Sequence, residues 1–125
     1  MFGIYSKWLG GATVRITASH TGLGATRDFA MRILHLTLKK KWFDMIASGE
    51  KTEEYREIKP YWNKRLHKTF HTHIRFRNGY RKDAPVMLVD MRGLLTIGYG
   101  NTLWGAPEDE MVYILRLGNI IEDAQ

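Results

Sequence analysis

The chain has 125 residues, of which 44% are hydrophobic and 26% charged, and it carries a net charge of +6. This length and composition predict one globular domain with a single core and exclude a disordered chain. No apolar run approaches the roughly 20 residues that a membrane-spanning helix needs, so we expect no membrane partner. The absence of cysteine excludes disulfides, thiolate catalysis and zinc–sulfur sites. It is also compatible with the cytoplasm, where we expect the protein.

The first thirty residues differ in character from the rest of the chain. Several glycines interrupt any long element, and Arg15 breaks the one apolar run, which is too short and too polar for a secretory signal. An apolar strand then begins abruptly at Met31. We therefore predict that residues 1–30 are an N-terminal appendage, such as an upstream start codon would add. The domain proper is expected to comprise residues 31–125.

Beyond Met31 the pattern predicts a strand, a helix, a second strand, a short helix and then further strands. Apolar residues predict the first strand, helical spacing predicts a helix that ends before Gly49, and Pro60 suits the first turn of the short helix. Asn78-Gly79 is a strong turn signal. The expected ranges after residue 30 are strands at 31–38, 71–76, 86–91, 94–99 and 112–117 and helices at 40–48 and 61–66. This order predicts an α+β fold with a small mixed β-barrel and about two short helices.

The most informative segment runs from Gly49 to Glu57 and carries six charged side chains. Glycine suits a sharp turn, and alternate residues of a strand share a face. Glu54 and Arg56 are therefore expected on one face of a short strand, and Lys51, at the turn, can reach toward Glu54. On residue types alone, the segment is either a structural ion-pair network or a polar pocket for a hydrogen-bonding ligand.

Four of these residues, Gly49, Lys51, Glu54 and Arg56, resemble the signature G-x-K-x-x-E-x-R of the ASCH (activating signal cointegrator homology) family. The similarity extends from Met31 to about residue 121. The resemblance implies a PUA-like β-barrel, a fold widely used to bind RNA, with a ligand cleft lined by Lys51, Glu54 and Arg56. The expected partner is RNA or a nucleotide-like small molecule.

Three further residues are candidates for the same cleft. Arg77 and Asn78 lie at the predicted hairpin tip and offer several hydrogen-bond donors. Trp104 lies in a loop rich in glycine and proline, where its ring could either cap a ligand or anchor the loop to the core.

Positive charge is concentrated in residues 59–82, which contain eight lysines and arginines and no acid. Five aromatic residues are interleaved with these cations. This combination is typical of surfaces that track a phosphate backbone and stack on bases, although the rings could equally face the core. We expect Lys64 and Arg65 to contact RNA.

Hydrolysis in the same cleft is the alternative function. Some ASCH members resemble ribonucleases, for which Glu54 would act as base while Lys51 and Arg56 stabilise the transition state. Others are amidohydrolases that act on acetylated cytidine, and in these a threonine occupies the position of Glu54. A module that binds an acidic protein is a third hypothesis. His71 and His73 share a strand face but have no evident third ligand, so we assign no metal and no cofactor.

Overall fold

The computed structural model describes residues 13–17 and 26–122, with side chains described from residue 30 onward. The chain divides into two compact units, at residues 1–33 and 34–125. In the first unit, β1 (Thr13–Thr17) and β2 (Thr26–Ala30) form an antiparallel hairpin. The predicted appendage, residues 1–30, lies largely outside the described residues and stays a prediction.

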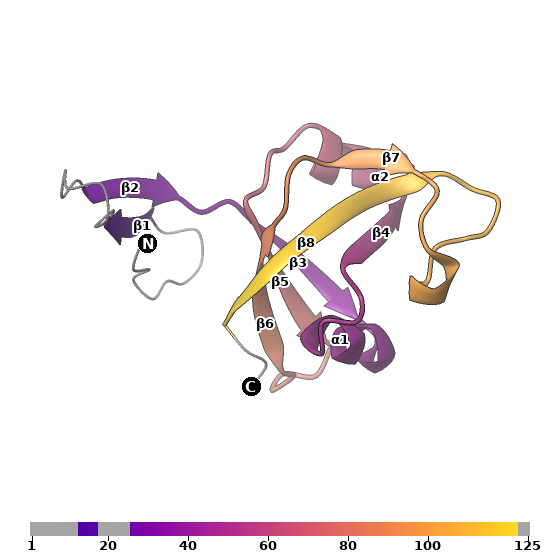
Figure 1. The fold of residues 1–125 in the computed structure, drawn as a ribbon, viewed down its shortest axis with the longest axis horizontal. Helices are drawn as coiled ribbons and strands as arrows, with labels where there is room; N and C mark the ends of the chain where they lie inside the picture. The colour runs from indigo at the N-terminus through magenta and orange to yellow at the C-terminus, as the bar shows by residue number, and fades with distance from the viewer. Residues whose placement is uncertain (1–12, 18–25, 123–125) are drawn as a thin grey trace. The chain divides into compact units, whose positions relative to one another are not determined.

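The second unit is built on a six-stranded sheet in the order β3-β5-β6-β8-β4, with β7 also paired to β8 (Figure 1). The sheet curls into half a barrel, so the predicted α+β fold with a small mixed barrel is confirmed. Its strands are β3 (Ile33–Leu38), β4 (Glu53–Glu57), β5 (His73–Asn78), β6 (Val86–Met91), β7 (Thr96–Gly98) and β8 (Val112–Glu122).

In the described residues, the helices are all short. Helix α1 (Lys40–Ala47) follows β3, and α2 (Pro60–Trp62) continues directly into a π-helical turn, η1 (Asn63–His67). A 3₁₀ turn, η2 (Thr102–Trp104), lies between β7 and β8. No helix in the described part of the chain is long and apolar enough to cross a membrane.

The core lies inside the curl of the sheet and is closed by one face of α1. Leu34, Leu36 and Leu38 alternate along β3 and are buried, as the period of a strand requires. Phe43 and Ile46, three positions apart on α1, join the same apolar cluster. The exposed face of the helix carries an ion pair between Lys40 and Asp44.

Strand β8 connects this core to the charged segment. Its first half pairs antiparallel with β4, and its second half pairs with β6. Glu54 lies opposite Leu115, and Arg56 lies opposite Tyr113. Because Leu115 and Tyr113 belong to the core, the pairing fixes strand β4 and its charged side chains against the most buried part of the sheet.

Candidate ligand-binding site

The end of helix α1 determines where Lys51 lies. Gly49 has a φ of 87°, a left-handed conformation that glycine adopts without steric cost. Its N–H donates to the carbonyl oxygen of Ile46, and the N–H of Lys51 donates to that of Met45. These bonds satisfy carbonyl groups that a helix end otherwise leaves without partners. The chain consequently turns back under the helix, and Lys51 enters the protein rather than solvent.

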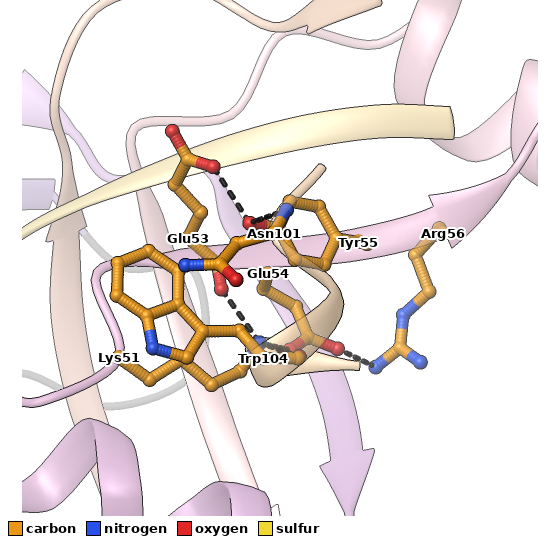
Figure 2. Close-up of polar contacts among 7 residues, drawn as sticks. All are labelled: Lys51, Glu53, Glu54, Tyr55, Arg56, Asn101 and Trp104. Carbon is orange, nitrogen blue, oxygen red and sulfur yellow. Dashed lines mark hydrogen bonds and ion pairs between the residues drawn. The ribbon is translucent and has the colours of Figure 1, made fainter. Parts of the chain in front are cut away.

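The ammonium group of Lys51 is buried and makes three polar contacts (Figure 2). Its Nζ donates to the carbonyl oxygens of Glu53, at 2.6 Å, and Trp104, at 2.9 Å. It also lies 3.1 Å from Oε1 of Glu54. An ammonium has three N–H groups, so these contacts use its whole donor capacity. Lys51 therefore ties the η2 loop to strand β4.

Aromatic rings surround the same ammonium. Nζ lies 4.8 Å from the centre of the Tyr55 ring and 5.4 Å from that of Trp42. Burial lowers the pKa of Lys51, while the charge of Glu54 opposes this by favouring the ammonium form. The rings add a cation–π attraction that also favours the charged form.

Glu54 links Lys51 to Arg56 in a row of three charges, as Figure 2 shows. Its second carboxylate oxygen, Oε2, lies 3.0 Å from a terminal nitrogen of Arg56. Glu54 is 5% exposed, whereas the Arg56 side chain is 21% exposed. The Nε–H of Arg56 is buried and has no hydrogen-bond partner among the described residues. The row thus begins at a fully satisfied lysine and ends at an arginine with spare donors.

The other face of β4 holds the loop that follows β7. The Tyr55 hydroxyl donates to Oε1 of Glu53 at 2.7 Å and accepts from the N–H of Asn101 at 3.0 Å. Burial and the nearby carboxylate raise the pKa of Tyr55, so the hydroxyl remains a donor. A side chain at Gly100 would collide with the Tyr55 ring, because its Cβ would lie 2.6 Å from it. The loop therefore packs directly on Tyr55.

Trp42 packs close to this loop at Gly105, the residue after Trp104. Gly105 has a φ of 99°, and a Cβ there would lie 3.0 Å from the Trp42 ring. Trp104, the preceding residue, packs against a small apolar cluster around Tyr55 and Ala106. Two indoles from distant parts of the chain are thereby placed beside the charged row.

A cavity of about 440 Å³ opens onto this arrangement. Glu54 and Arg56 supply its charged lining together with Lys39, and Trp42 and Trp104 supply two of its rings. The remaining lining comes from Thr37, Leu38, Tyr55, Gly79, Tyr80 and Gly105. Such a volume, with aromatic walls and a few fixed polar groups, suits a small organic ligand. Lys51, which was predicted to line the cleft, does not line this cavity; it contacts Glu54 and lines a separate cavity of about 240 Å³.

Four other residues predicted for the site, Lys64, Arg65, Arg77 and Asn78, do not line the 440 Å³ cavity. Arg65 lines a neighbouring cavity, whereas Lys64 is exposed and lines neither that cavity nor the 440 Å³ one. Arg77 donates to the carbonyl oxygens of Gly79 and Arg81, which closes the β5–β6 loop. Neither Arg77 nor Asn78 lines the 440 Å³ cavity, although the next two residues do. RNA contacts by Lys64, Arg77 and Asn78 stay predictions.

Tyr80, which is 88% exposed and lines the cavity, is one of the five aromatic residues interleaved with the cations of residues 59–82. Sequence reasoning missed two other residues that shape the site. Trp42 belongs to the helical spacing that predicts α1, and this spacing does not indicate a cavity. Asn101 contacts Tyr55 across 46 residues of sequence, a separation that no local pattern reveals.

Comparisons of the chain with protein-family models, curated proteins and solved structures found no match. The assignment of function accordingly depends on the geometry described above and on the signature motif.

Proposed function

We propose that the chain is an ASCH-like binding domain whose 440 Å³ cavity holds a nucleobase, as part of RNA or of a nucleotide-like molecule. One observation carries the proposal: a buried carboxylate, Glu54, and a partly buried guanidinium, Arg56, are held 3.0 Å apart in a cavity that two indoles also line. The carboxylate and guanidinium form an acceptor beside a donor, and the indoles offer flat apolar surface.

The two indoles support a planar ligand. Trp42 and Trp104 are both partly buried and line the same cavity. Base–aromatic stacking contributes about 1–3 kcal/mol per base and tolerates any base, because every base has a π face. Stacking would thus supply affinity without choosing among bases.

Glu54 and Arg56 support a choice among bases. Each carboxylate oxygen of Glu54 meets one cation and keeps a lone pair for a further donor. A base with an exocyclic amino group next to a ring-nitrogen acceptor matches this pair, since its N–H₂ can donate to Glu54 while Arg56 donates to the ring nitrogen. Cytosine and adenine have that edge, and uracil does not.

The contacts of Lys51 support binding over hydrolysis. A catalytic lysine needs an accessible nitrogen with a free lone pair or a proton to give. Nζ of Lys51 instead donates to three acceptors, and the residue is 2% exposed. Glu54 also occupies the position where the amidohydrolases that the motif resembles carry a threonine. The role that fits Lys51 is to hold Glu54 ionised and in place.

Calorimetric titration with cytidine, adenosine, guanosine, uridine and a short single-stranded RNA tests the proposal. Cytidine and adenosine should bind about tenfold or more tightly than uridine. Glu54→Gln should abolish that preference, and Glu57→Gln, an exposed acid on the same strand, should preserve it. Absence of binding by every nucleoside and by the RNA would refute the proposal, as would an unchanged preference in Glu54→Gln. Product formation from RNA or acetylated cytidine would favour hydrolysis instead.

A further inference from the structure

A second cavity, of about 290 Å³, adjoins the first. The two share three lining residues, Thr37, Arg56 and Tyr80. The rest of the second lining is His35, Leu36, Tyr61, Trp62 and Arg65. Glu54, the only acid that lines the first cavity, does not line the second, so two arginines face a space without a carboxylate among the described lining residues.

Both arginines are held against one indole. The guanidinium carbon of Arg56 lies 5.1 Å from the centre of the Trp62 ring, and that of Arg65 lies 5.2 Å from it. Cation–π attraction holds each of them there, while the two positive charges repel each other. Arg56 has Glu54 as a counter-ion, whereas no described carboxylate forms an ion pair with Arg65. An anion placed between them would relieve this repulsion.

Arg65 is positioned by its own element. Leu66, the next residue of η1, is buried in the core, and Asn63 accepts a hydrogen bond from the Tyr113 hydroxyl of strand β8. The Arg65 guanidinium donates to the Tyr61 hydroxyl at 3.1 Å and to the His35 carbonyl oxygen at 3.3 Å. A guanidinium has five N–H groups, so Arg65 is oriented by two and keeps others for a ligand.

The local electrostatic field is positive. His35 also lines the second cavity, and its pKa is lowered, first by burial and then by the charges of Arg75 and Arg65. Arg75 and Arg65 thus disfavour a further positive charge on His35, and the same positive field attracts an anion to the second cavity.

We propose that the second cavity is a phosphate subsite, in which Arg56 and Arg65 bind a phosphate whose base occupies the first cavity. This inference rests on the proposed function and narrows its ligand class from nucleosides to nucleotides. Arg56 lines both cavities and thereby connects base recognition to phosphate recognition. A free nucleotide and the backbone of RNA present the same phosphate chemistry.

The test compares cytidine with its 5′- and 3′-monophosphates and with a cytidine dinucleotide, by calorimetry at fixed low salt. The variants are Arg65→Gln and Arg92→Gln, which make the same change of charge at two arginines. Arg92 is exposed and lines neither cavity. In the wild type, at least one phosphorylated ligand should bind about tenfold to a hundredfold more tightly than cytidine, as charge-assisted hydrogen bonds allow. Arg65→Gln should remove most of this gain and leave cytidine affinity unchanged, and Arg92→Gln should keep the gain.

The possible outcomes distinguish failure of the phosphate subsite from failure of nucleobase binding. Equal affinity for cytidine and all phosphorylated ligands would overturn the subsite while leaving nucleobase binding intact. Equal losses in Arg65→Gln and Arg92→Gln would also overturn it, because they would indicate attraction by net charge alone. Failure of cytidine and of every phosphorylated ligand to bind would refute the proposed function itself. A gain restricted to the dinucleotide would identify the RNA backbone as the source of the phosphate, and a gain with a monophosphate would identify a free nucleotide.

Discussion

The ammonium of Lys51 lies 3.1 Å from a carboxylate oxygen of Glu54, three residues away, and both side chains are almost wholly removed from solvent. Lys40 and Asp44 form an i,i+4 pair on helix α1 at 2.5 Å, with both side chains more than half exposed. The Lys40–Asp44 pair is shorter but contributes less to stability, because solvent screens exposed charges. Buried charges such as Lys51 and Glu54 have no solvent and depend on each other.

Replacing Lys51 should therefore lower the free energy of unfolding strongly, and replacing Lys40 should change it little. Lys51→Met leaves Glu54 buried with one cation fewer and two carbonyl oxygens without their donor, so the free energy of unfolding should fall by about 3–5 kcal/mol. Lys40→Met should change it by less than about 1 kcal/mol. Urea denaturation measures both. The double variant Lys51→Met/Glu54→Gln should lose less than the sum of its single changes, and strict additivity would show that the pair is not coupled.

Tyr55→Phe should loosen the loop after β7. The change removes a hydroxyl that donates to Glu53 and accepts from Asn101, while the ring that packs on the loop remains. We expect a loss of about 1–3 kcal/mol in the free energy of unfolding and faster hydrogen exchange at the Asn101 amide. Tyr99→Phe, at a site that is 66% exposed, is the matched control. Unchanged exchange at Asn101 would count against this role of Tyr55.

Gly105→Ala tests the contact between the loop and Trp42. Gly105 and Gly93 both have positive φ values, 99° and 79°, but only at Gly105 would a Cβ meet another residue. Gly93→Ala should destabilise by about 1 kcal/mol through backbone strain alone. Gly105→Ala should lower the free energy of unfolding by more than Gly93→Ala does. It should also weaken nucleoside binding, because the new Cβ forces Trp42 to move. Equal costs with unchanged binding would show that the loop does not position Trp42.

Acid should destabilise the protein through two histidines. The pKa of His35 is lowered by burial, Arg75 and Arg65, and that of His73 is lowered by burial against an opposing effect of Asp90. The unfolded chain therefore binds protons first, so this contribution to stability is present above pH 6.5 and is lost as the pH falls through the lower folded-state values. Urea midpoints measured from pH 8 to pH 5 should decline, and His35→Gln/His73→Gln should flatten the decline. An equally steep profile in that variant would assign the effect to other groups.

Local patterns predicted the elements that depend on near neighbours. Helical spacing and Gly49 located α1 and its end, and strand alternation placed Glu54 and Arg56 on one face with Lys51 in reach. Each of these relationships spans fewer than ten residues, so a local sequence pattern is enough to predict it. The predicted strands at 86–91 and 112–117 also correspond to β6 and to the first part of β8.

Contacts between distant segments could not be predicted in the same way. Lys51 meets the Trp104 carbonyl across 53 residues, and Tyr55 meets Asn101 across 46. Both contacts require the register between β4 and β8 and the shape of the intervening loop. The β5–β6 loop shows a similar limit within a short segment. Arg77 donates to the carbonyl oxygens of Gly79 and Arg81, and the conformation of this seven-residue connection does not follow from an Asn-Gly pair.

The indole N–H signals of the tryptophans, followed by two-dimensional NMR during titration with cytidine, report whether a base enters the 440 Å³ cavity. Trp42 and Trp104 line the proposed base cavity, and Trp62 lines the neighbouring one. Cytidine should shift the signals of Trp42 and Trp104 in a saturable manner, with Trp62 responding strongly only to a phosphorylated ligand. Saturable cytidine binding that leaves Trp42 and Trp104 unshifted, or the absence of any shift with nucleosides, nucleotides and RNA, would refute nucleobase binding in this cavity.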